Sequence, residues 1–272
     1  MRTEKSNQRV NFLKTIVAEE YLNNENISLC ELSEKYHCCK GVLSRILKEL
    51  NIPLRNRYHD INLKYNFDKI NSEESAYWLG FIYADGSITY SPESDGIRYV
   101  LEIGLAIRDK EHLEKFKKFM GSDREITNRI KTNSCRFSIS SKELCINLYN
   151  LGIRKGKTYI LNIDEVLISI PKEYIKDFIR GYTDGDGSIF KDGTVSYTSY
   201  FRETMEILLL KLPFKIEYKI YIRDNRCPRI CITRKQYYLK VLDFIYKDAT
   251  IFLDRKYEKY IAILQRNSQY YQ

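Results

Sequence analysis

The chain has 272 residues, and its 45 lysines and arginines outnumber its 36 aspartates and glutamates, which gives a formal net charge of +9 at pH 7. This length allows a small domain beside a larger one with its own core, and the positive charge favours an anionic partner, above all nucleic acid. The chain has no run of about 18 apolar residues and no apolar signal-peptide core, so we expect neither a membrane partner nor secretion.

The cysteine content indicates a reducing compartment. Seven cysteines are scattered along the chain without paired C-x-x-C motifs. We therefore expect an intracellular protein, cytoplasmic or nucleoid-associated. Cys30, His37, Cys38 and Cys39 lie near one another in the sequence, but their spacing fits no usual zinc finger, so zinc binding is the weaker interpretation.

Residues 1–57 are predicted to form a small all-α domain. Helices are expected over about 10–22, 28–36 and 39–50, the second opened by a capping box from Ser28 to Glu31. The last two helices resemble a helix-turn-helix DNA-binding unit. Its shared core would consist of Leu32, Leu43, Ile46, Leu47 and Leu50, and its DNA-binding candidates are Lys40, Gly41, Ser44 and Arg45 at the exposed start of the third helix.

Charge supports DNA contact by this segment. Residues 35–57 hold six basic side chains and one acidic one. Arg55 and Arg57 lie in an arm that could follow a minor groove or a phosphate backbone. The alternative is an ordinary helical hairpin that packs against the rest of the chain. Residues 58–70 are expected to form a polar linker.

The remainder of the chain is dominated by an internal repeat. Residues 76–88 (AYWLGFIYADGSI) recur without a gap as residues 177–189 (DFIRGYTDGDGSI), with an offset of 101 residues between Asp85 and Asp186. A repeat of this kind implies two related subdomains, here 71–160 and 161–272. Each copy is predicted to be a helix followed by a strand.

The helix of each copy has recognisable signals. Asn71 with Glu74 suggests a capping box, and Pro171 suits a first helical position. Small residues recur at four-residue spacing, as at Gly80 and Gly181, although glycine inside a helix costs about 1 kcal/mol relative to alanine. Because this spacing keeps them on one face, we predict that the two helices pack closely along these faces.

This packing would bring Asp85 and Asp186 together at the C-terminal ends of the helices, each just before a glycine that would end the helix. There the helix dipole and mutual repulsion disfavour their charges. A divalent cation between or beside them would relieve both effects. Carboxylates, backbone carbonyls and water suit Mg²⁺, which can support a phosphodiester displacement.

These residues resemble the LAGLIDADG homing endonucleases. Residues 78–86 and 179–187 occupy the nine motif positions twice, and the resemblance extends over roughly residues 70–265. It implies that Asp85 and Asp186 bind the catalytic metal, with the backbone carbonyls of Ala84 and Gly185 beside them. Tyr83 departs from the motif where Asp184 keeps its aspartate, at a position that is generally not catalytic in the family.

The predicted fold class is α+β, with each repeat ordered α-β-β-α-β-β-α around an antiparallel sheet. In the first repeat, helices are expected to end at 84 and to span 110–120 and 142–151, with strands from 87, around 99–105, near 125–130 and at 135–139. In the second, a helix after Pro171, one ending at 210 and one over 236–246 alternate with strands near 188, 195, 215–222 and 229–233.

Two further features concern DNA. Residues 211–240 hold nine basic side chains and only two acidic ones, Glu217 and Asp224, so one face of the second sheet could lie on duplex DNA. The alternative is an ordinary solvated polar face. Which strand residues would read base edges depends on the strand register, which the sequence leaves open. The resemblance also implies a basic residue near the end of each repeat that assists catalysis. Lys157 and Lys256 are the candidates, while the alternative is a surface lysine without a specific role.

The sequence thus predicts a site-specific, Mg²⁺-dependent endonuclease that cleaves double-stranded DNA at a long target and acts as a monomer. A DNA-binding regulator or an intron maturase that no longer cleaves, the latter with intron RNA as a partner, is the alternative; retention of both aspartates favours the enzyme. An intein is disfavoured, because the ends of the chain show no splicing nucleophile and no terminal His-Asn pair.

Overall fold

The computed structural model describes residues 4–24, 27, 29–54, 63–93, 96–224 and 226–268, and the chain divides after Arg57 into two units, 1–57 and 58–272. Two of the DNA-binding candidates, Arg55 and Arg57, lie outside the described residues. None of the described helices is both long enough and apolar enough to cross a membrane.

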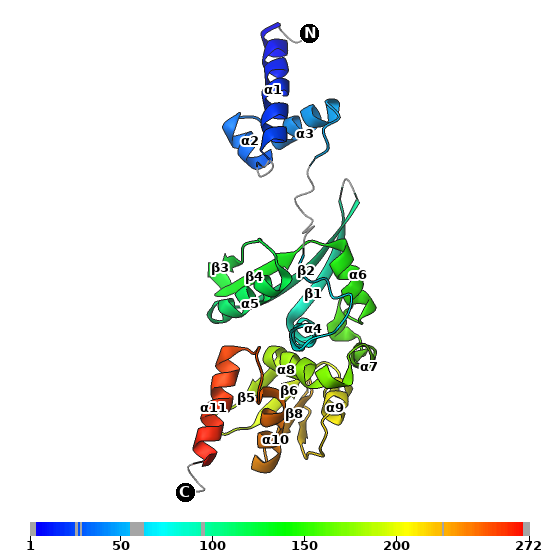
Figure 1. Cartoon of the computed structure of the whole chain (residues 1–272), viewed down its shortest axis with the longest axis vertical. Helices are drawn as coiled ribbons and strands as arrows, with labels where there is room; N and C mark the ends of the chain where they lie inside the picture. The colour runs from blue at the N-terminus through cyan, green and yellow to red at the C-terminus, as the bar shows by residue number, and fades with distance from the viewer. Residues whose placement is uncertain are drawn as a thin grey trace. The chain divides into compact units, whose positions relative to one another are not determined.

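The described part of the N-terminal unit contains three helices, α1 (Glu4–Asn23), α2 (Leu29–Lys35) and α3 (Lys40–Glu49) (Figure 1). His37 adopts φ 48° in the turn between α2 and α3. The core consists of Val17, Tyr21, Ile27, Leu32, Leu43, Ile46 and Leu47. Leu50 was expected in this core but is 42% exposed, because α3 ends at Glu49 and Leu50 forms its C-cap.

The larger unit consists of two successive repeats. The first contains α4 (Glu73–Asp85), β1 (Gly86–Glu93), β2 (Gly96–Ala106), η1 (Ile107–Asp109), α5 (Lys110–Met120), β3 (Thr127–Arg129), η2 (Ile130–Thr132), β4 (Ser134–Ile139), α6 (Lys142–Asn150) and η3 (Lys157–Tyr159). After α7 (Ile163–Ile168), the second contains η4 (Lys172–Tyr174), α8 (Ile175–Asp186), β5 (Gly187–Ile189), β6 (Val195–Thr198), α9 (Arg202–Leu210), β7 (Lys219–Tyr221), β8 (Arg229–Ile232), α10 (Lys235–Tyr246) and α11 (Asp254–Ser268).

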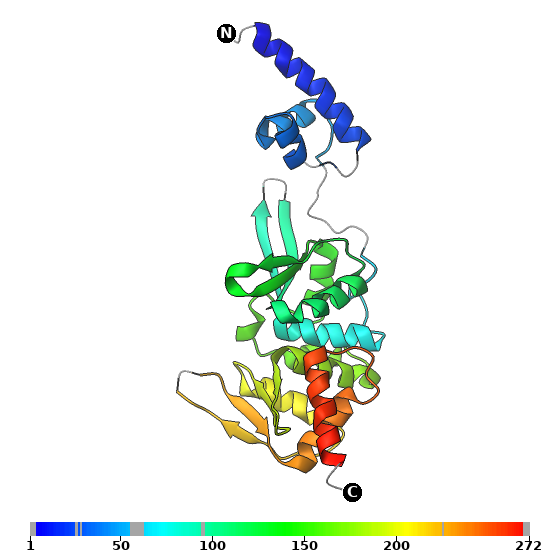
Figure 2. The ribbon, with the colours of Figure 1, turned by 90° about the vertical axis from the view of Figure 1, so that its left-hand side faces the viewer.

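Each repeat folds into one four-stranded antiparallel sheet, and the two sheets have equivalent strand orders, β1-β2-β4-β3 and β5-β6-β8-β7. In Figure 2, α4 and α8 run across the middle of this unit with one sheet on either side. The mixed helix and sheet class and its pseudo-symmetry are therefore as predicted. Strand β4 has one buried face and one more exposed face. Its residues Cys135, Phe137 and Ile139 are buried, and the residues between them point to the opposite, polar face.

One hydrophobic cluster extends through both repeats, from the first-repeat residues around Trp78 and Phe116 to the second-repeat residues around Ile230 and Leu242. Phe67 and Ile70 are also buried in it. Residues 63–70 were expected to belong to a polar linker, and instead they pack on the core. Their apolar side chains remove more surface from water in that position than in an extended tether.

Three local expectations need correction. The N-cap of α4 is Ser72, which forms a capping box with Ser75, rather than Asn71 with Glu74. Pro171 precedes the short helix η4 that leads into α8, so it is not the first residue of α8 itself. Helices α7 and α11 were not predicted.

Candidate active site

The two motif helices, α4 and α8, pack at the closest approach that backbones allow. A Cβ atom placed on Gly80 would lie 2.1 Å from the carbonyl oxygen of Phe178, and one placed on Gly181 would lie 1.9 Å from that of Tyr77. Any side chain at either glycine would therefore overlap the backbone of the other helix. The predicted packing along the small-residue faces is confirmed.

Both motif aspartates end their helices, as Asp85 does for α4 and Asp186 for α8. The glycines that follow have φ values of −75° and −77°, so they are not the left-handed stops that the sequence suggested. Their role is steric, because a Cβ atom at Gly86 would lie 2.7 Å from Ile82 O and one at Gly187 would lie 2.5 Å from Thr183 O.

The carboxyl group of Asp85 lies against the other helix. A Cβ atom on Gly185 would come within 3.2 Å of Asp85 Oδ2 and within 2.3 Å of the Cβ atom of Ala84. Gly185 immediately precedes Asp186, so the C-terminal ends of the two motif helices are in contact, and Asp85 lies beside the residue that precedes Asp186.

Lys157 and Lys256 reach the C-terminal ends of these helices in equivalent ways. Lys157 Nζ donates to the carbonyl oxygens of Ala84 at 3.0 Å and Gly86 at 2.6 Å. Lys256 Nζ donates to the four carbonyl oxygens of Thr183 (2.7 Å), Asp184 (2.6 Å), Gly185 (3.3 Å) and Gly187 (2.6 Å). A cation is favourable at this negative end of a helix dipole. Neither lysine is an unconstrained surface side chain.

Burial shapes the charge state of the whole group. Burial, and then the negative charge of Asp186, raises the pKa of Asp85 to about 6. Asp186 is the more exposed of the two by surface area, yet burial of its carboxyl group still raises its pKa, against the opposing effect of Lys157 and Lys256. Burial lowers the pKa of Lys256 to about 8 and also lowers that of Lys157. Because burial disfavours the charged form of both carboxylates, a bound cation would stabilise them.

Asp184, the motif aspartate that Tyr83 replaces in the first repeat, has a structural role. Its buried carboxylate accepts hydrogen bonds from the hydroxyls of Tyr77 at 2.8 Å and Tyr246 at 2.5 Å and from the backbone N–H of Leu253 at 2.8 Å. It therefore fixes the segment that leads into α11 and Lys256.

Two pockets lie beside the carboxylates. The Asp85 pocket has a volume of about 440 Å³, and the charged residues that line it are Asp85, Arg108, Asp109, Arg129, Arg136 and Arg255, with Gly185 also contributing. The Asp186 pocket, of about 200 Å³, is lined by Asp186, Lys157, Ala84, Ile160, Cys227, four aromatic residues (Tyr83, Tyr182, Tyr200 and Phe201) and the hydroxyls of Thr198, Ser199 and Thr204. Each pocket thus combines the carboxylate of one repeat with residues of the other.

The donor atoms at this site fit a magnesium ion. Within the described parts of the chain, no three His, Cys, Asp or Glu side chains gather as a metal cluster. Mg²⁺ commonly binds through one or two carboxylates and completes its shell with water and substrate phosphate. Asp85 and Asp186 supply such carboxylates. The carbonyls of Ala84 and Gly185 accept from lysines but keep a second lone pair.

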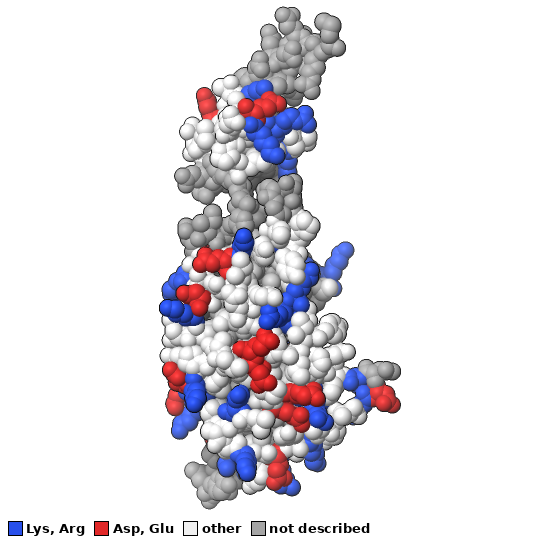
Figure 3. All heavy atoms as spheres, turned by 90° about the vertical axis from the view of Figure 1, so that its right-hand side faces the viewer, with Lys and Arg blue, Asp and Glu red and all other residues white. Residues whose placement is uncertain are grey.

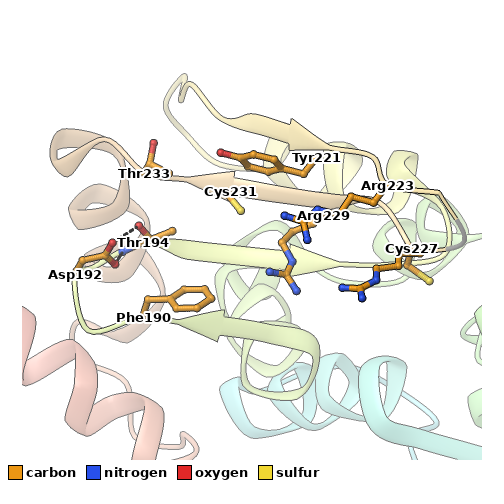
Figure 4. A pocket seen from close by; sticks show the side chains of 10 residues that line it. Phe190, Asp192, Thr194, Tyr221, Arg223, Cys227, Arg229, Cys231 and Thr233 are labelled. Carbon is orange, nitrogen blue, oxygen red and sulfur yellow. Dashed lines mark hydrogen bonds between the residues drawn. The ribbon is translucent and has the colours of Figure 1, made fainter.

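The second sheet carries a basic pocket on its polar face. The pocket has a volume of about 380 Å³, and Arg223, Arg226 and Arg229 line it together with Tyr221 and Phe190. Figure 4 shows Tyr221 on β7, Arg229 on β8, Arg223 in the loop between these strands and Phe190 in the turn after β5. The register places Arg229 and Cys231, alternate residues of β8, on this face. Of the basic segment 211–240, only part lines this pocket.

Charge is distributed differently elsewhere. On the face of the larger unit that carries α6, α7 and α9, acidic and basic side chains are interspersed (Figure 3). In the N-terminal unit, Lys40, Gly41 and Arg45 are exposed in the first turns of α3, and Ser44 is half-buried. These positions are open to solvent, as a DNA-contacting surface requires.

Sequence reasoning missed the residues that the first sheet brings to Asp85. Arg255 donates to both carboxylate oxygens of Asp109, at 2.9 and 3.0 Å, across 146 positions of sequence. Arg108, Arg129 and Arg136 come from three different elements of the first repeat. Their only sequence signal was alternation along predicted strands, which does not identify a shared pocket.

Comparison with known proteins agrees with the doubled motif. Residues 173–246 match the family model of the LAGLIDADG-like domain. Curated relatives include a probable translation initiation factor IF-2 of Thermococcus kodakarensis, 27% identical over 154 residues, which covers 54% of this chain and 12% of that protein. An elongation factor 2 of Methanopyrus kandleri is 25% identical over 219 residues, with coverage of 73% and 16%. The chain thus spans only 12% and 16% of the length of these two relatives.

Similar solved structures include the LAGLIDADG homing endonuclease I-LtrWI bound to target DNA, at 14% identity, 72% coverage of this chain, 92% of the other and a TM-score of 0.48. I-DmoI in complex with DNA and Ca is 18% identical, with coverage of 67% and 91% and a TM-score of 0.47. Residues 173–246, which match the model of the LAGLIDADG-like domain, hold the second copy of the motif that is doubled on α4 and α8.

Proposed function

We propose that this protein is a site-specific, Mg²⁺-dependent endonuclease that cleaves both strands of a long duplex DNA target. The observation that carries the proposal is the pair of motif aspartates, Asp85 and Asp186, at the ends of two helices in backbone contact. A protein that only binds DNA gains nothing from two carboxylates at a surface that would meet phosphates.

In this function Asp85 and Asp186 would hold the cation, beside the carbonyls of Ala84 and Gly185. A cation held there would supply Lewis-acid chemistry, which polarises a phosphate and makes water a better nucleophile. In the hydrolysis itself, the water oxygen forms a bond to phosphorus, one P–O ester bond breaks, and the proton of the water ends on the leaving alcohol. Lys157 and Lys256 supply fixed positive charge for the developing negative charge on the phosphate.

DNA would lie along the polar faces of the two sheets. The arginine-lined pocket formed around β7 and β8 provides charge-assisted contacts to phosphates and bidentate donors for base edges. Lys40, Ser44 and Arg45 of α3 would extend the footprint through the N-terminal unit. With one aspartate serving each strand, a single chain suffices, so a monomer is expected to be active.

The test is cleavage of a large randomised duplex library with and without Mg²⁺. We expect recovery of one long, partly asymmetric cut site. The isosteric variants Asp85→Asn and Asp186→Asn should each lose double-strand cleavage while they still bind the recovered site. EDTA should abolish cleavage by the wild-type protein without changing its circular dichroism spectrum.

Other outcomes point to other functions. Enrichment of bound duplexes without cleavage, by wild type and variants alike, would refute the nuclease and favour a DNA-binding regulator. Absence of duplex enrichment, with selective binding of structured RNA, would favour a maturase.

A further inference from the structure

The first repeat carries an apolar groove on the side of its sheet opposite the polar face. The groove has a volume of about 300 Å³ and is lined by residues of β1, β2 and α6, which lie side by side in Figure 1. Because side chains alternate along a strand, Tyr90 lies on the same face of β1 as the buried Ile88. A duplex on the polar face of the sheet would therefore leave this groove open.

The helices cover only part of this face of the sheet. Ile88 lies opposite Leu101 in the register, and these two side chains are 5% and 1% exposed. Tyr90 lies opposite Tyr99 in the next pair on the same face, and Tyr90 is 50% exposed. Ile97, further along the hairpin, is also exposed. Large apolar side chains that gather at an exposed groove are typical of a binding surface.

The groove combines aromatic rings with cations. Tyr90, Tyr99 and Tyr149 all line it. The ring centroids of Tyr90 and Tyr99 lie 6.3 Å apart, at an interplanar angle of 42°, and Tyr149 on α6 is exposed. Lys155 Nζ lies 4.5 Å from the centroid of the Tyr90 ring, and Cζ of Arg154 lies 4.3 Å from that of the Tyr149 ring. Both exposed tyrosines thus have a positive charge over the ring.

The charge of the groove is positive. Its described lining includes Lys155 and neither an aspartate nor a glutamate. Arg154 pairs with Glu165 at 2.8 Å, whereas Lys155 pairs with no carboxylate among the described residues. An anionic ligand would therefore meet the charge of Lys155 without breaking an ion pair.

Aromatic rings beside cations suit single-stranded nucleic acid. An unpaired base stacks on an aromatic ring, while lysine or arginine contacts the phosphate backbone. The bases of a duplex cannot stack in this way, because their faces are already covered by neighbouring bases. An acidic peptide would also use the lysine, but the flat rings of three tyrosines match the faces of bases better than branched side chains.

We propose that the groove between the β1–β2 hairpin and α6 binds single-stranded nucleic acid, with bases stacked on Tyr90 and Tyr149 and a neighbouring phosphate at Lys155. The inference goes beyond the proposed endonuclease, because it assigns a second nucleic-acid site to the face of the first repeat that a duplex would not use. Stacking and phosphate contact do not read the sugar, so RNA and DNA strands of one sequence should bind with similar affinity.

The experiment measures binding of the full-length protein to fluorescein-labelled strands of about 12 thymidines or uridines, a length within the range of single-strand sites. Fluorescence anisotropy is recorded in EDTA, with an excess of unlabelled blunt duplex to occupy the polar faces of the sheets. We expect binding that the duplex does not displace. A strand of the same length without bases should bind roughly tenfold more weakly or worse, because it offers charge without stacking.

Substitutions separate stacking from charge. Tyr90→Leu and Tyr149→Leu keep apolar bulk without the aromatic ring, and each should weaken strand binding roughly tenfold. Tyr90→Phe keeps the ring and should bind within about twofold of wild type. Lys155→Ala should reduce the slope of log affinity against log salt by about 0.7, the contribution of one phosphate contact with a single strand.

Tyr218→Leu is the matched control, because Tyr218 is an exposed tyrosine of the second repeat that does not line the groove. This substitution should leave strand binding unchanged. Thermal melting of each variant checks that the fold is kept.

Three results would overturn the inference: displacement of the strand by duplex, equal binding of the strand without bases, or unchanged affinity in both Tyr90→Leu and Tyr149→Leu. Failure of every strand to bind would overturn it as well, and enrichment of acidic peptides from a library, lost in Tyr90→Leu, would then assign the groove to a protein partner. Cleavage of the randomised duplex library tests the endonuclease separately, so either proposal can fail while the other stands.

Discussion

The backbone contact between α4 and α8 makes Gly181→Ala an informative substitution. In an ordinary exposed helix, the change from glycine to alanine raises the free energy of unfolding by up to about 1 kcal/mol. Here the new methyl group would lie 1.9 Å from Tyr77 O and 2.9 Å from Phe81 N, where real Cβ atoms essentially never come closer than 3.0 Å. Because both neighbours are backbone, no side chain can rotate away, and the helices must separate by about 1 Å.

Such a separation weakens contacts along the whole helix pair, since a gap of about 0.5–1 Å forfeits a quarter to a half of each dispersion contact. Overpacking costs about 1–3 kcal/mol or more, so we expect a net loss of about 2 kcal/mol in the free energy of unfolding. For a unit of this size that corresponds to a fall in Tm of about 4–8 °C.

Urea and thermal unfolding followed by circular dichroism would measure the loss. Two controls isolate the cause. A Cβ atom on Gly104 in β2 meets only Cys135 O at 3.9 Å, and one on Gly41 in α3 meets nothing within 4 Å. Gly41→Ala should stabilise its own unit slightly, and Gly104→Ala should cost less than about 1 kcal/mol. A Gly181→Ala variant as stable as wild type would refute the packing argument.

Three other substitutions test buried groups. Arg180→Lys should lower the free energy of unfolding by about 3 kcal/mol, because lysine lacks the fork with which Arg180 binds the buried Asp177 carboxylate and two carbonyls; urea midpoints close to wild type would contradict this. Burial lowers the pKa of His112 to about 3, so below pH 6.5 the unfolded chain binds a proton that the folded chain does not, and stability falls by up to about 1.4 kcal/mol per pH unit down to about pH 3. His112→Phe should flatten that slope in urea titrations from pH 7 to pH 4, and parallel curves would exclude His112 as its source. Asp184→Asn should cost about 1–3 kcal/mol, because its amide N–H₂ meets hydroxyl and Leu253 N–H donors; an unchanged Tm would show that these bonds are replaceable.

Elements with strong local periodicity were predictable from the sequence. Helix α5 was expected over 110–120 and is Lys110–Met120, because its apolar residues recur at helical spacing and Gly121 follows in the left-handed region. The two sheets were predicted from the alternation of apolar and polar residues along their strands. The contact between the motif helices was predicted from Gly80 and Gly181, because glycine inside a helix lowers its stability.

Features decided by tertiary contact were not predictable. Asn71 with Glu74 and Ser72 with Ser75 have the same three-residue spacing, so the sequence does not show which pair forms the capping box. The structure shows that Ser72 and Ser75 form it. Helix α11 was missed, and its packing on α10 and β5 is a tertiary contact that the sequence does not display. The candidate lysines were proposed from the family resemblance and their charge, because their carbonyl partners lie about 70 residues away in the sequence.

Because Asp85 shares its pocket with Gly185 and Arg255, and Asp186 shares its pocket with Ala84 and Lys157, the repeats are not interchangeable modules. Replacing one repeat with that of a relative, as a route to a new DNA target, would exchange a carboxylate in one pocket and a basic side chain in the other at the same time. Graft boundaries that keep η3 and the start of α11 with their present partners are therefore needed to change recognition without changing the chemistry.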